Sequence, residues 1–280
     1  MVSLKLFDVL MWTIRRSEHD IVNMYDSLSP MMQITTDGDM LNFGYWNKDS
    51  PTPLSAQNRL CEIVGELAEL DNRKILLDVG SGLLGPAKKW RKNFPDIDIF
   101  SININFSQLK NSKTSSYDEI IRLNSTSRLL PFTDQSVDCI IALESAQHFK
   151  KLEDFIYECK RVLEFNGILV FAIPIISEKI SNIKDLGILS FTWTSEHYTL
   201  EQVTSKIKNS GFKIEHIETI GKNVYPPMAD YYIENRKSLQ KNISSKYPNY
   251  VEKILFNSMK KMKKVSENKI IDYALIKCKL

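Results

Sequence analysis

A glycine-rich turn carries the residue types that most directly indicate ligand chemistry. The stretch LLDVGSGLLGPAKKW, residues 76–90, places Asp78, Gly80 and Gly82 after an apolar run. Because glycine has no Cβ, the backbone there can turn tightly and approach a bound molecule closely. The GxGxxG spacing of residues 80–85 is weak evidence for a dinucleotide, and no Gly-Lys-Ser/Thr follows to form a Walker phosphate loop. A structural turn that binds nothing is the alternative.

Asp78 narrows the class of ligand, because a pyrophosphate prefers helix N–H groups with no anion nearby. A carboxylate immediately before the glycines favours a cationic ligand or one with N–H donors. S-adenosylmethionine (SAM) has no phosphate and carries an ammonium, a sulfonium and a carboxylate. The turn therefore fits SAM better than a phosphorylated nucleotide.

His148 is the strongest candidate for a general base, because imidazole titrates near neutral pH. It follows ALES, residues 142–145, at the expected end of a central strand. Methyl transfer from a sulfonium is an in-line displacement, and a hydroxyl or amine acceptor must also lose a proton. The alternative for His148 is positioning of SAM or capping of a helix. Glu144 either binds SAM or orders the loop.

The elements that position these residues alternate between strand-like and helix-like pieces, which predicts a doubly wound α/β sheet with right-handed crossovers. Continuous apolar runs such as residues 74–80 are typical of parallel strands buried on both faces. The expected strands cover residues 74–80, 97–103, 119–124, 137–144, 167–175, 212–220 and 270–280. The expected helices cover residues 6–24, 54–70, 86–94, 106–112, 152–163 and 200–210, and residues 27–53 are expected to form a loop.

We expect a single domain over residues 1–280. It comprises an N-terminal helical lid (1–70), a SAM-binding core (71–220), a mostly helical cap insertion (221–268) and the last strand (269–280). Between Lys222 and Lys264 we count ten basic against three acidic residues, which suits a solvated helical face. An acidic ligand or a membrane surface is the alternative. Tyr225, Tyr231 and Tyr232 either wall an acceptor pocket or pack the cap onto the core.

Composition restricts the class of protein. A net charge of +3 is too small to indicate nucleic-acid binding. The four cysteines show neither CxxC pairs nor metal-ligand spacing, so we expect no metal site and reduced thiols in a cytoplasmic protein. The apolar N-terminus contains charges and lacks a cleavage site, so we expect neither a signal peptide nor a transmembrane segment.

Several motifs, in order, resemble the class I SAM-dependent methyltransferases. The resemblance is to the small-molecule subgroup that acts on sugars, sterols, tocopherols and polyketides and is related to the cyclopropane-lipid synthases. It covers roughly residues 25–220 and the final strand. The motifs are LLDVGSGLLGPA (76–87), IFSININFSQL (99–109), RLLPFTDQSVDCIIALESAQHF (128–149), RVLEFNGILVFAIPI (161–175), NMYDSLS (23–29) and LNFGYW (41–46). The family resemblance implies a Rossmann-like fold with N-terminal helices and a helical cap before the last strand.

The resemblance also implies roles for individual residues. Gly80 and Gly82 would line the methionine moiety, and Asp78 would orient its ammonium through the loop or a water. Asn103, helped by Gln108, falls where relatives hold the ribose with an acidic residue. Thr126 likewise takes the place of an acid that accepts from the adenine amino group. Tyr25 would close over SAM, Ile104 would pack on adenine, and Ser127 would offer a backbone N–H. The other implied cofactor residues are Ser81 and Leu143.

The predicted function is transfer of the SAM methyl to a hydroxyl, or to an amine or carbon, of a small-molecule acceptor, with S-adenosylhomocysteine (SAH) as product. A non-catalytic binding module on the same fold is the main alternative, because Asn103 and Thr126 are neutral. A nicotinamide oxidoreductase would need an acidic ribose anchor near Asn103. A methyltransferase that acts on RNA or protein is a further alternative, motivated by the basic insertion. The missing NPPY-like tetrapeptide argues against amino-group methylation of bases, and no nucleic-acid partner is expected. The oligomeric state stays open, with a homodimer as one alternative.

Overall fold

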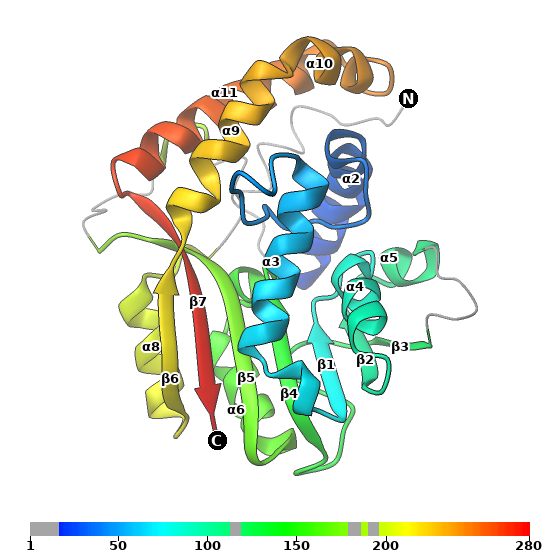
Figure 1. Cartoon of the computed structure of the whole chain (residues 1–280), viewed down its shortest axis with the longest axis vertical. Coiled ribbons are helices and arrows are strands. Elements are labelled where there is room, and N and C mark those ends of the chain that lie inside the picture. The colour runs from blue at the N-terminus through cyan, green and yellow to red at the C-terminus, as the bar shows by residue number, and fades with distance from the viewer. Residues whose placement is uncertain (1–16, 113–118, 179–185, 190–195) are drawn as a thin grey trace.

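The computed structural model describes residues 17–112, 119–178, 186–189 and 196–280. At its centre is a seven-stranded sheet of order β3-β2-β1-β4-β5-β7-β6 (Figure 1). The strands are β1 (Ile75–Val79), β2 (Asp98–Asn103), β3 (Ile120–Asn124), β4 (Val137–Leu143), β5 (Leu163–Ile176), β6 (Lys213–Thr219) and β7 (Ile271–Lys279). β7 pairs antiparallel with β5 and β6, whereas the other pairs are parallel. The predicted doubly wound, mostly parallel sheet is confirmed.

Helices cover both faces of this sheet, because successive strand side chains point to opposite sides. Leu76 belongs to an apolar cluster with α3 and α4, whereas its neighbour Leu77 belongs to one with α6 and α8. The helices are α2 (Glu18–Thr36), α3 (Pro53–Leu67), α4 (Gly85–Asn93), α5 (Phe106–Asn111), α6 (Leu152–Val162), α8 (Leu200–Asn209), α9 (Tyr225–Glu234), α10 (Arg236–Ser244) and α11 (Asn249–Glu267). Strands β1 to β6 all run in one direction, so their carboxyl ends share one edge of the sheet, and only the antiparallel β7 ends at the other edge.

The N-terminal helix region differs from the prediction. A helix over residues 6–24 is expected, but α2 runs from Glu18 to Thr36, and residues 1–16 lie outside the described part. The expected loop is therefore wrong over residues 27–36. Pro30 lies inside the helix, where it removes one backbone hydrogen bond. Met31 packs with Ile243 and Tyr247 of the cap region, and this tertiary contact sustains the helix beyond the proline.

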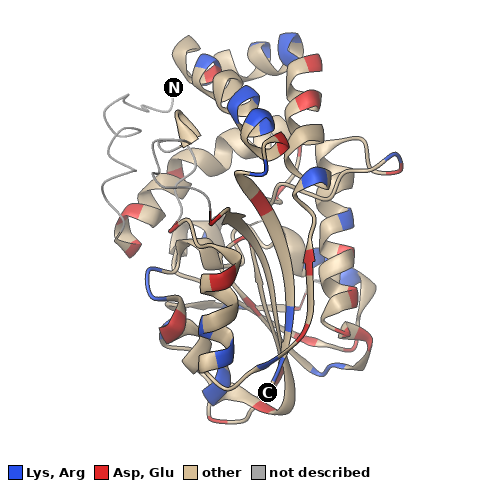
Figure 2. Cartoon of the chain, turned by 90° about the vertical axis from the view of Figure 1, so that its left-hand side faces the viewer, with Lys and Arg blue, Asp and Glu red and all other residues tan. Residues whose placement is uncertain are grey.

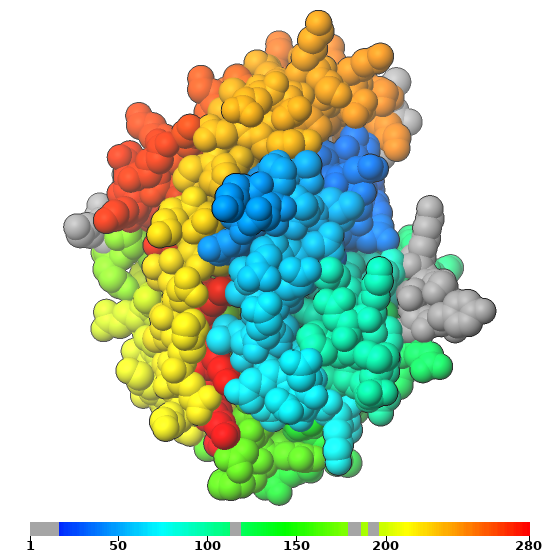
Figure 3. Space-filling model, viewed as in Figure 1, coloured from blue at the N-terminus to red at the C-terminus, as the bar shows by residue number. Residues whose placement is uncertain are grey.

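Helices α9, α10 and α11 lie between β6 and β7 in the chain, within residues 221–268. They pack beside α2 above the carboxyl edge of the sheet (Figures 1 and 3). Figure 2 shows lysines and arginines along these helices, and most of those between residues 222 and 264 are exposed, as expected for a solvated face. The division of the chain into lid, core and cap stays a prediction.

None of the helices within residues 17–112, 119–178, 186–189 and 196–280 is long and apolar enough to cross a bilayer.

Candidate functional site

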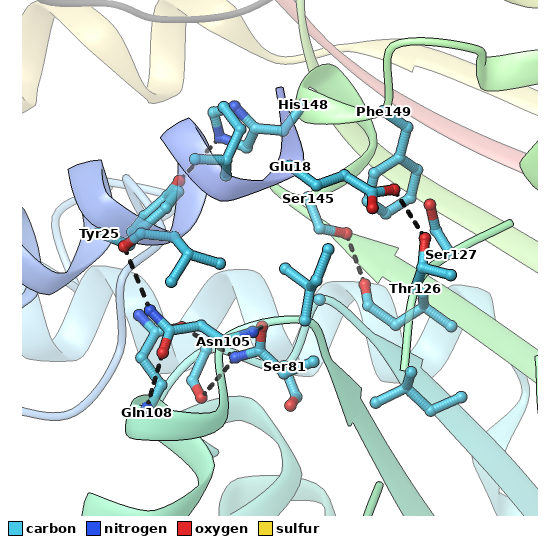
Figure 4. A pocket seen from close by; sticks show the side chains of 18 of the residues that line it. Glu18, Tyr25, Ser81, Asn105, Gln108, Thr126, Ser127, Ser145, His148 and Phe149 are labelled. Carbon is cyan, nitrogen blue, oxygen red and sulfur yellow. Dashed lines mark hydrogen bonds between the residues drawn. The ribbon is translucent and has the colours of Figure 1, made fainter. Parts of the chain in front are cut away.

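A cavity of about 590 Å³ opens at the carboxyl ends of β1, β2 and β4, beneath α2. Such edges are where open α/β sheets bind ligands. The structure brings nearly all the predicted site residues together around it. Those that line it are Tyr25, Gly80, Ser81, Gly82, Asn103, Ile104, Gln108, Thr126, Ser127, Leu143, Glu144 and His148 (Figure 4). Asp78 is the exception, because it lies behind the glycine turn, outside the lining.

The glycine turn is required by its protein neighbours as well as by any ligand. Gly80 has a φ of 85°, and a Cβ there would lie 2.2 Å from the Cβ of Ser145. Ser145 follows β4, and its hydroxyl donates to the carbonyl of Val79 at 2.6 Å. Leu84, at a φ of 65°, is fully buried in the core and does not line the cavity. A Cβ on Gly85 would lie 2.6 Å from Met40 Cγ, because the Asp39–Met40 segment crosses the start of α4 there.

The expected ribose anchor is already engaged within the protein. The Asn103 side-chain amide donates to the Gly82 carbonyl at 3.1 Å and to Gln108 Oε1 at 2.8 Å. Its oxygen accepts from the Asn105 backbone N–H at 3.0 Å. Gln108 in turn donates to the Ser29 hydroxyl on α2 at 2.8 Å. Asn103 therefore braces the glycine turn against α5 and α2, and only its remaining oxygen lone pair is available to a ligand.

The opposite wall of the cavity contains a carboxylate that the sequence reasoning missed. Glu18, at the first turn of α2, accepts from the Thr126 hydroxyl at 2.8 Å (Figure 4). Arg128 also donates to the same carboxylate oxygen, from Nε at 3.1 Å. Glu18, Thr126 and Arg128 all line the cavity. The capping box at Ser17 is the sequence signal that could have located this helix start.

A second, smaller cavity of about 210 Å³ adjoins the first. Its lining is mainly apolar and includes six methionines, Met24, Met31, Met32, Met228, Met259 and Met262. The cap contributes Tyr231 and Tyr232 to it, whereas Tyr225 is fully buried in the core. Tyr225 thus packs into the core, whereas an acceptor pocket at Tyr231 and Tyr232 stays a prediction.

The two cavities share five lining residues, Tyr25, Leu41, Asn42, Glu144 and His148. At this junction the Tyr25 hydroxyl lies 2.8 Å from His148 Nε2, and the side-chain amide nitrogen of Gln147 lies 3.3 Å from the same atom. With the Gln147 amide nitrogen as donor, Nε2 is the acceptor, whereas Nδ1 is buried without a hydrogen-bond partner among the described residues. Burial, followed by the charge of His197, lowers the pKa of His148 to about 4. The imidazole is therefore neutral at pH 7.

Glu144 follows β4 in a left-handed backbone conformation with a φ of 49°. One of its oxygens accepts from the Phe43 backbone N–H at 2.8 Å and from the Tyr273 hydroxyl at 3.0 Å. Burial raises the pKa of Glu144 to about 8, although both hydrogen bonds lower it. The carboxyl group orders the loop at Phe43, and a catalytic role for it stays a prediction.

Asp78 is buried, and its Oδ2 has no hydrogen-bond partner among the described residues. Burial raises its pKa to about 7. An isolated buried carboxylate is costly when ionised, so a cationic group bound nearby would stabilise the charged form.

Comparisons with known proteins agree with this geometry. A methyltransferase-domain family model matches residues 77–171. The chain is 22% identical to erythromycin 3''-O-methyltransferase of Saccharopolyspora erythraea over 265 residues, covering 87% of this chain and 85% of that protein. It is 28% identical to 27-O-demethylrifamycin SV methyltransferase of Amycolatopsis mediterranei over 156 residues, covering 54% and 57%. A mycolic acid cyclopropane synthase complexed with SAH and CTAB shares the fold, with a TM-score of 0.77, 14% identity and coverage of 91% and 95%.

Proposed function

We propose that this chain, a SAM-dependent methyltransferase that shares its fold with a cyclopropane synthase, methylates a hydroxyl group of an uncharged, largely apolar small molecule. The observation that carries the proposal is the junction of two unlike cavities at Tyr25 and His148. The larger cavity suits the cofactor, and the smaller, methionine-rich one suits an acceptor. The reacting hydroxyl would lie where the two meet.

The residues of the larger cavity fit SAM. Asp78 Oδ2 is buried without a hydrogen-bond partner among the described residues, two positions before Gly80, so its carboxylate would favour a cationic ammonium bound at the glycine turn. Ser81, whose hydroxyl is buried without a partner among the described residues, can bind the ligand carboxylate. The lining residues that remain for the adenine are Ile104, Thr126 and Ser127.

The chemistry of the second cavity supports an uncharged acceptor. Its described lining contains no lysine or arginine that could bind a phosphate or carboxylate. Asn42 Oδ1 and Gln57 Oε1 are buried there without hydrogen-bond partners among the described residues. Both are acceptors, so they favour hydroxyl donors on the ligand. The two curated relatives named above carry O-demethyl or O-methyl in their names, which agrees with a hydroxyl acceptor.

We propose that His148 takes up the acceptor proton through Tyr25. When bound, SAM supplies an electrophilic methyl on a sulfonium whose positive charge disappears on transfer. The Tyr25 hydroxyl accepts the acceptor proton while donating its own to His148 Nε2, with which it is already hydrogen-bonded. Burial, followed by the charge of Glu144, raises the pKa of Tyr25, so it stays neutral and relays the proton. The net charge of the site is unchanged, which makes an imidazolium tolerable despite the low pKa of His148.

An acceptor panel tests the proposal. We expect SAM-dependent methylation of uncharged hydroxylated macrolactones, sterols or phenols, and at least about a hundredfold lower kcat/KM for their phosphate esters, since burying an unpaired anion is costly. Product analysis by mass spectrometry would locate the methyl on oxygen. Preferred methylation of the phosphorylated compounds, or methylation only on nitrogen or carbon, would contradict it.

The Asp78 carboxyl gives a prediction that depends on pH. The folded protein keeps this proton up to about pH 7, whereas the unfolded chain releases it near pH 4. The free energy of unfolding of the ligand-free protein should therefore fall as pH rises between about 4 and 7. Asp78→Asn removes this effect, so we expect the variant to be more stable than wild type at pH 8 by on the order of 2 kcal/mol, with a smaller gain at pH 5.

Urea denaturation at both pH values measures that gain, and calorimetry should show SAH binding weakened by about tenfold. Asp98→Asn is the matched control, because Asp98 is exposed at the start of β2 and should change neither quantity. A variant of Asp78 that loses stability at pH 8 and binds SAH normally would refute the assigned role.

A further inference from the structure

The start of α2 places the carboxylate of Glu18 in the wall of the cofactor cavity, beside Thr126. Glu18 Oε1 accepts from Thr126 and Arg128, but no described residue donates to Oε2. Ser127, which follows Thr126 in the chain, and Ile104 also line the cavity. A nucleobase there presents an exocyclic amine, which is a donor, and Glu18 is the acidic side chain that lies against Thr126.

One face of α2 spans the larger cavity from Glu18 to Tyr25, where the two cavities meet. Glu18, Val22 and Tyr25 all line it, at the three- and four-residue spacing that brings helix side chains to one side. The rise from Glu18 to Tyr25 is about 10 Å, at about 1.5 Å per residue. The same helix therefore contacts the adenine end through Glu18 and the reacting end through the Tyr25–His148 hydrogen bond.

We propose that Glu18 accepts a hydrogen bond from the adenine amino group and so couples cofactor binding to the placement of Tyr25 over the junction. Glu18 is therefore a specificity and positioning residue. It comes from the N-terminal helix and replaces the acidic side chain that the family resemblance implies at the position of Thr126. Arg128 holds the Glu18 side chain against Thr126. The Glu18 side chain therefore loses little conformational freedom when the ligand binds. This inference rests on the proposed function insofar as the ligand is an adenosyl compound.

Calorimetry with SAH and with its 6-deamino analogue, which lacks only the amino group, tests the hydrogen bond. We expect wild type to bind SAH about tenfold more tightly than the analogue. In Glu18→Ala this ratio should fall to about one. In Arg128→Ala, the matched control, both affinities should fall by the same factor, so that the ratio stays near tenfold. Glu18→Gln, which keeps a neutral acceptor, should retain part of the ratio.

Hydrogen exchange tests the coupling. SAH should protect the amides of α2 in wild type, and this protection should decrease with the deamino analogue and in Glu18→Ala. A tenfold ratio that persists in Glu18→Ala, or α2 protection that is the same for both ligands, would overturn the proposal. A wild-type protein that binds neither ligand would instead contradict the proposed function, so the two failures are distinguishable.

Discussion

Replacing His148 by alanine is expected to lower kcat for methyl transfer by about 10²- to 10³-fold, because a positioned general base contributes about this much. The residue lies at the junction of the two cavities, and its Nε2 lies 2.8 Å from the Tyr25 hydroxyl. Burial keeps the imidazole neutral above about pH 4, so it can accept a proton at pH 7. Because Asp78 and the glycine turn remain, SAH affinity should change by less than about threefold. Stopped-time assays and calorimetry measure the two quantities.

Tyr25→Phe is the matched variant, because it removes only the hydroxyl that contacts His148. If the proton passes through this hydroxyl, Tyr25→Phe should approach the loss seen for His148→Ala. The double variant should then be no slower than the slower single one, since the two residues act as one unit. A His148→Ala enzyme with wild-type kcat would show that this histidine does not take the proton.

Replacing Gly80 by alanine is expected to abolish SAH binding and to destabilise the protein by about 2–4 kcal/mol. A side chain there is strained at a φ of 85° and would overlap the Cβ of Ser145, 2.2 Å away. Relieving the overlap must move either the turn or the end of β4, and both line the cofactor cavity. Urea denaturation and calorimetry with SAH give the two effects.

Gly82→Ala is the matched control within the same turn. Its φ of 54° is less strained for alanine, and the nearest atom to an added Cβ is the end of the Leu41 side chain, at 3.2 Å. We expect a loss of about 1 kcal/mol in stability. Equal effects of the two substitutions would contradict the view that contact with Ser145 makes Gly80 indispensable.

Much of the fold could be predicted from the sequence because the sheet is buried on both faces. The continuous apolar runs that become β1, β4 and β5 admit few other placements, and the strand-helix alternation fixes the layers. The extent of α2 could not be predicted in this way. Serine and proline between residues 27 and 30 are local signals of a loop, yet packing of Met31 against the cap outweighs them.

The site, too, could be predicted only in part from the sequence. Residue types on the strand edge identify the cavity, since nearly all of them come from one edge of one sheet. Glu18 is not adjacent to that edge in sequence, and only the docking of α2 brings it to Thr126. The use of the Asn103 amide inside the protein is likewise a tertiary effect, because its partners Gly82 and Gln108 come from two separate segments.

A crystal structure of the complex with SAH tests the central claim most directly, because the claim concerns which cavity holds which ligand. We predict that the sulfur lies at the junction, beside Tyr25 and His148, with the amino acid moiety at the glycine turn. The adenine should lie between Ile104 and Thr126, with its amino group directed to Glu18, and the methionine-rich cavity should remain open to an acceptor. SAH bound in the smaller cavity, or bound in reverse with adenine at the junction, would contradict the account.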